Sequence, residues 1–175
     1  MKREIKIAIS GRSGCGNTTI SKMVADNLKL RFVNFTFRTL AQDRGLDLKT
    51  VLSLAANDDS WDREVDTGQV MLAREGGGCV LGSRLAIWML EEADLKVYLN
   101  ASPATRAERI VKREGGNLDE VAAFTAERDR QDHGRYLRIY GIDTDDYGFV
   151  DVVIETDNMS PQEIADLIIK KAGEI

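Results

Sequence analysis

The sequence predicts an α/β fold in three layers, in which helices flank a doubly wound parallel sheet of about five strands. Short β-branched runs alternate along the chain with longer amphipathic segments, as strands alternate with crossover helices in such folds. A glycine-rich turn joins the first run to the first amphipathic segment. The chain has 175 residues, of which 43% are hydrophobic and 30% charged, so it suits one domain over residues 1–175 with a full core.

The strands are predicted from apolar runs that are short and bounded by turn residues. They are expected at residues 5–10, 31–35, 79–81, 95–99 and 152–154. The first run continues directly into the glycines, so we expect a buried strand that ends at the turn. Ligands of doubly wound sheets bind at the carboxyl ends of the strands, and this turn would lie there.

The helices are predicted from apolar residues that recur on one face and from start and stop signals. They are expected at residues 17–28, in two short segments between 39 and 57, at 61–75, and from Pro161 onward. The segments between the second and third strands would form a helical insert over residues 37–76. A helical hairpin is expected over residues 104–140, interrupted at Gly115-Gly116-Asn117. The sheet core would therefore carry two helical additions.

The turn after the first strand has the frame of a phosphate-binding loop, G-x-x-x-x-G-K-[ST], with Asn17 in place of the lysine. In such loops the backbone amides and the start of the next helix converge on an anion. The residues expected to bind ATP phosphates are Gly11, Ser13, Gly14, Cys15, Gly16, Asn17, Thr18 and Thr19. Thr18 would also join the magnesium shell. The Asn17 amide can donate to a phosphate oxygen but carries no charge, so the exchange puts catalysis in question more than binding.

The hairpin over residues 104–140 concentrates cations in an acidic chain. They are Arg106, Arg109, Lys112, Arg113, Arg128, Arg130, Arg135 and Arg138. Glutamates at helical spacing could pair with several of them, which would make the hairpin an ordinary solvated face. A phosphate-transfer site without a loop lysine, however, needs guanidinium groups from elsewhere. We therefore expect the hairpin to supply guanidinium groups to the phosphates, with Arg109 among the residues that bind ATP phosphates.

Composition excludes some classes of function. The net charge of −5 disfavours a protein that binds nucleic acid by neutralising its phosphates, although small anionic ligands stay compatible. No apolar run approaches the roughly 18 residues that would span a membrane, and we expect a cytoplasmic protein. Cys15 and Cys79 are too few for a disulfide or zinc framework. Because Cys15 lies in the loop, alkylation of its thiol is expected to affect nucleotide binding.

Three further patterns carry a resemblance to a known family. They are Asp58-x-x-x-Asp62-x-x-x-Asp66-x-x-Gln69, the run from Arg106 to Gly115, and Arg135-Tyr136 followed by Tyr140-Gly141-Ile142-Asp143. The chain resembles cytidylate kinases over nearly its whole length, nearest those of the compact archaeal type. The resemblance implies a three-layer P-loop kinase fold with an acceptor-binding insert and an arginine-rich lid. It also implies transfer of phosphoryl from ATP, with Mg²⁺, to CMP or dCMP.

The resemblance assigns roles to individual residues. Arg128, Asp132 and Arg135, in the spacing R-D-x-x-D-x-x-R, match catalytic residues of the bacterial enzymes that bridge phosphates and orient the pyrimidine nucleotide. The residues expected to bind the acceptor are Arg38, Asp62, Asp66, Gln69 and Arg84. The two arginines would hold its phosphate, and the other three would read its sugar and base unless they are only a polar solvent face. His133 is expected to be exposed and without a catalytic role.

Two departures from the family pattern leave alternatives open. Besides Asn17, the chain has Gly82 where the family usually carries an acid after the third strand. One alternative is a nucleotide-binding sensor or regulator with impaired catalysis, because both departures remove catalytic charges while the binding frame is kept. Another is a kinase of a different small acceptor, such as AMP or a small metabolite.

Overall fold

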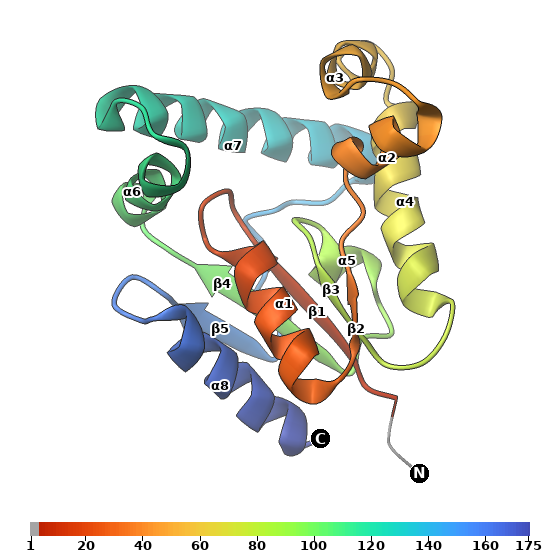
Figure 1. Cartoon of the computed structure of the whole chain (residues 1–175), viewed down its shortest axis with the longest axis vertical. Helices are drawn as coiled ribbons and strands as arrows, with labels where there is room; N and C mark the ends of the chain where they lie inside the picture. Colours follow the sequence, from red (N-terminus) through yellow and green to blue (C-terminus); the bar gives the residue numbers. More distant parts are fainter. Residues whose placement is uncertain (1–3) are drawn as a thin grey trace.

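The computed structural model describes residues 4–175 and has a five-stranded, fully parallel sheet with the strand order β2-β3-β1-β4-β5 (Figure 1). The strands are β1 (Lys6–Gly11), β2 (Arg31–Val33), β3 (Cys79–Gly82), β4 (Leu95–Asn100) and β5 (Val152–Glu155). The prediction of a doubly wound parallel sheet is confirmed. The second strand is shorter than expected, because Asn34 and Phe35 leave the sheet and turn into the site described below.

Eight helices surround this sheet within the described part of the chain. They are α1 (Asn17–Leu28), α2 (Phe37–Arg44), α3 (Leu48–Ala55), α4 (Ser60–Arg74), α5 (Ala86–Met89), α6 (Pro103–Glu114), α7 (Leu118–Tyr140) and α8 (Pro161–Gly173). All the predicted helices are present within a few residues of their expected bounds. The four-residue helix α5 escaped prediction because it is too short to show a helical period. Among these helices none is long and apolar enough to cross a membrane.

The core lies in two layers, one on each face of the sheet. On one face, α1 packs against α8, and Ile20, Val24 and Ile168 are at most 1% exposed. On the other face, α4 and α5 cover the sheet through residues such as Ala73 and Ile87. The middle strand β1 is buried on both sides, as expected for a parallel sheet covered by helices. These layers hold the carboxyl ends of β1, β2 and β3 in fixed positions.

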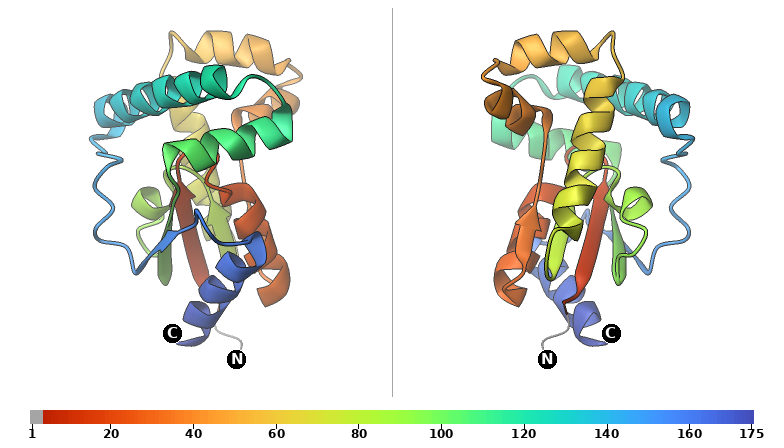
Figure 2. Two further views of the ribbon diagram at one scale, coloured as in Figure 1. Left: turned by 90° about the vertical axis from the view of Figure 1, so that its left-hand side faces the viewer. Right: turned by 90° about the vertical axis from the view of Figure 1, so that its right-hand side faces the viewer.

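The two helical additions lie at the carboxyl end of the sheet (Figures 1 and 2). The insert consists of α2, α3 and α4, and the basic hairpin consists of α6 and α7, which pack against each other. Ser102 caps α6 through the amide of Thr105, and Asn117 caps α7. Figure 1 shows the long helix α7 crossing from α6 to the insert. The hairpin and the insert therefore lie on either side of the glycine-rich loop.

Candidate active site

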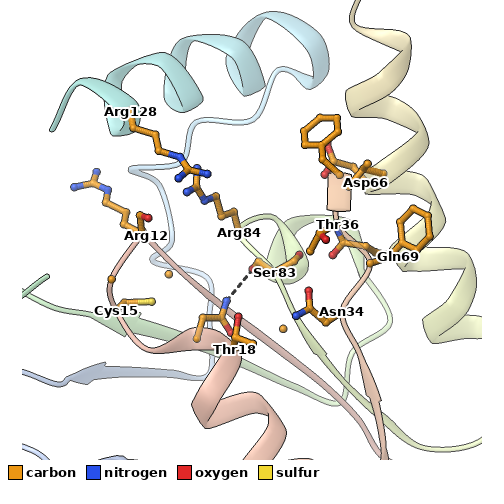
Figure 3. Close-up of a pocket in the computed structure, with 18 of the residues that line it drawn as sticks. Arg12, Cys15, Thr18, Asn34, Thr36, Asp66, Gln69, Ser83, Arg84 and Arg128 are labelled. Carbon is orange, nitrogen blue, oxygen red and sulfur yellow. Dashed lines mark hydrogen bonds between the residues drawn. The ribbon is translucent and has the colours of Figure 1, made fainter. Parts of the chain in front are cut away.

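A cleft of about 360 Å³ lies between the glycine-rich loop, α4 and α7 (Figure 3). Residues 11–19 of the loop form one wall. The other lining residues are Asn34, Phe35, Thr36, Phe37, Asp62, Val65, Asp66, Gln69, Gly82, Ser83, Arg84, Arg113, Arg128, Arg135 and Tyr136. The cleft therefore brings together most of the residues that the sequence assigned to phosphate and acceptor binding.

The Asn17 side chain does not extend along the loop as a phosphate ligand. Its Nδ2 donates to the carbonyl of Ile9 at 3.0 Å and to that of Ser83 at 3.2 Å, and its Oδ1 accepts from the Ser21 hydroxyl at 2.8 Å. These bonds join the start of α1 to the ends of β1 and β3. Both amide protons of Asn17 already have acceptors. In this arrangement the side chain therefore does not donate to a phosphate, as the sequence had led us to expect.

Gly82 packs directly against the side chains of Ser21 and Asn17. A Cβ at this position would lie 2.4 Å from the Ser21 hydroxyl oxygen, 2.7 Å from Ser21 Cβ and 3.1 Å from Asn17 Oδ1. Such distances are too short without movement of α1, so the position accepts only glycine in this arrangement. The acid that was expected after the third strand has no space here, because Ser21 and Asn17 occupy it.

Two arginines of α6 support the loop from behind. Arg106 is 3% exposed, donates to the Ser13 carbonyl at 3.1 Å and pairs with Asp129 of α7 at 2.8 Å. Arg109 donates to the Cys15 carbonyl at 3.3 Å and to the Thr156 carbonyl at 2.7 Å. Arg109 was expected among the residues that bind ATP phosphates, but its guanidinium joins the loop to the end of β5 and does not line the cleft. The long-range contact of Arg106 gave no signal in the sequence.

The Cys15 thiol lies beneath the loop and is 1% exposed. Burial raises its pKa to about 11, which outweighs the lowering by a backbone hydrogen bond and by nearby arginines. A thiolate is the reactive form, so this cysteine is a packing residue and the expected sensitivity to alkylation is not supported. Both cysteines are buried and free.

Two arginines approach each other across the cleft above the loop. Arg84 follows β3, and Arg128 projects from α7 toward it (Figure 3). Burial lowers the pKa of Arg84, and the positive charge of Arg128 adds to this effect. Arg84 pairs with Asp132, whereas Arg128 has no hydrogen bond or ion pair with the described residues. Like charges held together beside a glycine-rich loop of this frame suit an anion such as a phosphate group.

The C-terminal half of α7 is bound to α4 by polar contacts. Arg135 pairs with Asp132 on its own helix at 2.9 Å and with Asp62 of α4 at 2.9 Å. Tyr140 donates to Asp66 Oδ2 at 2.7 Å. The three residues of the R-D-x-x-D-x-x-R pattern thus lie on the side of α7 that faces the cleft and α4.

Three buried polar residues of α4 line the far end of the cleft: Asp62, Asp66 and Gln69 are 3%, 9% and 6% exposed. Burial raises the pKa of Asp62 against the opposing effect of Arg135. Burial also raises the pKa of Asp66 to about 6, although the Tyr140 hydrogen bond lowers it. The alternative that these residues form only a polar solvent face does not hold.

Arg38 is not brought to the cleft. Thr36 caps α2, Phe37 is its first residue and lines the cleft, and Arg38 lies one position further on, where it is exposed. Successive helical residues differ in direction by about 100°, so an inward Phe37 turns Arg38 outward. Arg84 and Arg128 lie at the cleft instead.

Oxygen-bearing side chains at the strand ends were missed by the sequence analysis. Asn34 follows β2 and Ser83 follows β3, and both lie near the exposed Thr18 at the foot of the cleft (Figure 3). Their positions directly after predicted strands are the signal that could have found them. Hard oxygen donors suit Mg²⁺, which usually completes its shell with waters and substrate phosphates. The residues present therefore fit a magnesium ion bound together with a nucleotide.

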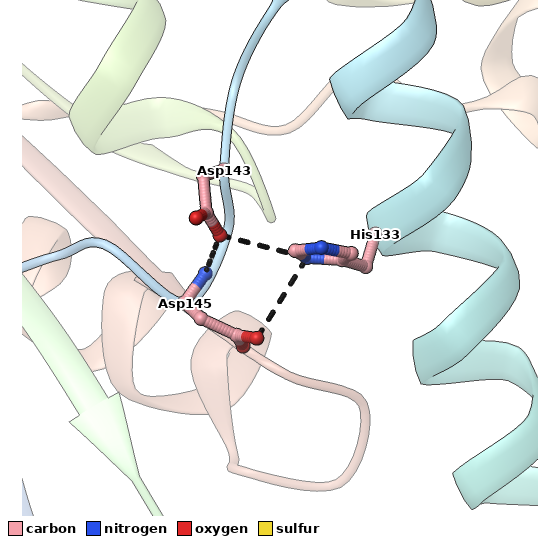
Figure 4. Close-up of side chains that lie close together, drawn as sticks. All are labelled: His133, Asp143 and Asp145. Atoms are coloured by element: carbon pink, nitrogen blue, oxygen red, sulfur yellow. Dashed lines mark hydrogen bonds and ion pairs between the residues drawn. The ribbon is translucent and has the colours of Figure 1, made fainter.

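His133 lies outside this cleft in a polar cluster behind it (Figure 4). Its ring is 33% exposed, with Nδ1 3.0 Å from Thr144 Oγ1, 3.7 Å from Asp143 and 3.9 Å from Asp145. Asp145 also pairs with Arg12 of the loop, so one carboxylate of the cluster already has a cationic partner. His133 is half-buried instead of exposed, and the cluster connects α7, the following loop and the glycine-rich loop.

Solved kinase structures share this fold. A shikimate kinase from Bacteroides thetaiotaomicron aligns with a TM-score of 0.66 and 15% identity over 97% of this chain and 96% of that chain. A deoxyadenosine kinase from M. mycoides with bound dATP aligns with a TM-score of 0.57 and 18% identity over 97% and 100% of the two chains. Together, the sheet topology, the loop and these neighbours define the P-loop kinase fold.

Similarity in sequence identifies the family. Residues 6–158 match the cytidylate kinase-like family. Cytidylate kinase 2 of Borreliella burgdorferi is 45% identical over 168 residues, which cover 94% of this chain and 93% of that relative. The cytidylate kinase of Pyrococcus horikoshii is 40% identical over 165 residues, which cover 93% and 85%. The chain therefore belongs to the cytidylate kinase-like family and is a nucleoside monophosphate kinase, as its motifs predict.

Proposed function

We propose that the protein transfers the γ-phosphoryl group of ATP to CMP or dCMP. The observation that supports this most directly is the single cleft that joins the loop, the facing Arg84 and Arg128, and the buried polar residues of α4. A donor phosphate at the loop and an acceptor nucleotide against α4 would meet beneath the two guanidiniums. The acceptor follows from the names of the relatives, which are cytidylate kinases.

Each part of the cleft has a role in this reaction. The loop amides bind the donor phosphates, and Arg84 and Arg135 orient the acceptor phosphate for attack on the donor. Thr18 would hold a magnesium ion that neutralises charge on the donor phosphates. Arg128, which has no partner in the described residues, supplies positive charge where the missing lysine would have done so. The lid arginines thus replace the loop lysine.

Removal of the Arg128 guanidinium tests this role. A transition-state contact of this kind is worth about 3 kcal/mol, so Arg128→Ala should lower kcat/KM for CMP by about 10²- to 10³-fold. Its unfolding free energy should stay within about 0.5 kcal/mol of the wild type, because the residue is exposed. A coupled assay with Mg-ATP and urea unfolding measure both quantities.

Arg130→Ala is the matched control, because Arg130 lies on the same helix, is exposed and pairs with Glu127 outside the cleft. It should leave kcat/KM within about twofold of the wild type. Equal activity of Arg128→Ala and the wild type would refute the role of the lid arginine. If the wild type binds nucleotides but phosphorylates no nucleoside monophosphate above background, the proposed reaction itself is refuted.

A further inference from the structure

A buried guanidinium on α6 joins the glycine-rich loop to α7. Arg106 is 3% exposed; its Nη1 donates to the Ser13 carbonyl at 3.1 Å, and its Nη2 pairs with Asp129 Oδ2 at 2.8 Å. Asp129 is the one carboxylate that pairs with this guanidinium in the described residues, and its side chain is 15% exposed. Because a buried charge requires such partners, these two contacts fix Ser13 and Asp129 relative to each other.

The loop lies against α6 at the same residue. A Cβ on Gly14 would be 2.7 Å from the Arg106 carbonyl oxygen and 3.0 Å from Arg106 Cβ, and the φ of Gly14 is +82°. Only glycine allows this approach and this backbone conformation together. The loop therefore cannot move toward α6, while the hydrogen bond from Arg106 to Ser13 opposes movement away from it. The positions of the loop amides thus depend on Arg106.

Asp129 directly follows Arg128 on α7. Successive helical residues differ in direction by about 100°, so the same helical turn directs Asp129 to Arg106 and Arg128 to the cleft. Arg128 has no hydrogen bond or ion pair with the described residues, so its direction depends on the backbone that carries it. The charge of Asp129 also acts on Arg84: burial lowers the pKa of Arg84, and Asp129 is among the groups that oppose this shift. Asp129 therefore lies between the loop and both arginines of the cleft.

We propose that Asp129 is a positioning residue for phosphoryl transfer, and that it acts through Arg106 to hold Arg128 in a fixed place relative to the loop. The proposal rests on the proposed function. In that reaction the loop amides and Arg128 act on the same phosphoryl group, although they belong to segments far apart in the chain. A misplacement of about 1 Å can lower a rate about 10²-fold, so the distance between these groups must be held. The pair of Arg106 and Asp129 is the contact that holds it.

The experiment measures the rate constant of phosphoryl transfer from Mg-ATP to CMP in single turnovers, for a double-mutant cycle at positions 128 and 129. Asp129→Asn should lower this rate constant about 10- to 100-fold. It should change the dissociation constant of ATP by less than about threefold, because the hydrogen bond from Arg106 to Ser13 is retained. In the Arg128→Ala background the same exchange should lower the rate constant by less than about twofold, because no guanidinium is left to position.

This coupling separates positioning from a purely structural role. A contact that served stability alone would lower the free energy of unfolding in urea and would change the rate constant by equal factors in both backgrounds. Glu127→Gln is the matched control, since it removes a carboxylate on the other side of Arg128. Glu127 is exposed and pairs with Arg130 outside the cleft, so this variant should stay within about twofold of the wild-type rate constant.

A second variant keeps the test independent of how Asp129→Asn folds. Arg106→Lys retains the buried charge, but an ammonium lacks the planar fork with which the guanidinium binds Ser13 and Asp129 together. Its effect on the rate constant should be at least about fivefold larger in the presence of Arg128 than in the Arg128→Ala background.

Two results would overturn the positioning proposal. One is a folded Asp129→Asn protein that transfers phosphoryl at the wild-type rate. The other is a set of equal factors in the two backgrounds, for Asp129→Asn and Arg106→Lys alike, because the pair would then not act through Arg128. Both results leave the proposed reaction intact, since the wild type still phosphorylates CMP. A wild type that binds nucleotides without transferring phosphoryl refutes the proposed reaction and the positioning role with it.

Discussion

The Asn17 side chain fixes the start of α1 to the ends of two strands. Its amide donates to the carbonyls of Ile9 and Ser83 and accepts from the Ser21 hydroxyl. It therefore acts as a structural connection between α1, β1 and β3. In the proposed function, the positive charge that a loop lysine would supply comes from Arg128 of α7, which lines the cleft.

A lysine at this position should therefore harm the protein. Asn17→Lys removes three hydrogen bonds, each worth about 0.5–1.5 kcal/mol net, so the free energy of unfolding should fall by about 1.5–4.5 kcal/mol without a gain in kcat/KM. Urea unfolding and the coupled assay measure these effects. Asn27→Lys, on the exposed face of the same helix, should change stability by less than about 0.5 kcal/mol. An Asn17→Lys protein that is both as stable as and more active than the wild type would contradict this interpretation.

At the level of elements, the contact of α1 with β3 depends on glycine at position 82. Gly82→Ala should destabilise by about 1–3 kcal/mol, because the new Cβ meets Ser21. Ser21→Gly removes the atoms that the new Cβ would meet, and by itself it should destabilise by about 1 kcal/mol because glycine is unfavourable in a helix. In the double variant the destabilisation caused by the alanine should largely disappear. A double-mutant cycle with urea unfolding measures this coupling. Gly148→Ala, with nothing within 4 Å, is the control, and strictly additive effects would argue against the contact.

Most elements could be predicted from the sequence, since strands and helices leave local patterns. The hairpin of α6 and α7 was found through its glycine break and its helical spacing. The short α5 and the early end of β2 were not found, because four residues show no period and the departure of Asn34 depends on the cleft. The outward direction of Arg38 and the contacts of Arg109 with Cys15 and Thr156 could not be predicted, because neither a motif position nor the charge of a helix reveals which way a side chain faces. The support of the loop by Arg106 joins positions far apart in the chain, which one sequence cannot show.

In the whole molecule, the burial that places Asp66 at the cleft also lowers the stability of the folded protein at neutral pH. The folded-state pKa of about 6 lies above the ordinary value of 3.8, so the folded protein binds more protons between these values and loses stability as the pH rises through this range. Asp66→Asn removes the free-energy cost of burying an ionised carboxylate. It should raise the free energy of unfolding, by about 1–3 kcal/mol at pH 8 and by about 1 kcal/mol less at pH 5.

Urea unfolding at both pH values measures this effect, with Glu64→Gln as the exposed control. An equal change at pH 5 and pH 8 would contradict it. A gain in stability on removal of a buried polar group is expected where that group serves binding and not folding.

The contact of Asn17, Ser21 and Gly82 also has a consequence for how such loops change during evolution. A chain that acquires an acid at position 82 must first clear the space beside Ser21, and a chain that acquires a lysine at position 17 leaves the Ser21 hydroxyl without its acceptor. Single exchanges therefore pass through less stable proteins. Among descendants of a common ancestor, the three positions should vary together, so that lysine-containing and asparagine-containing loops form separate lineages with few intermediates.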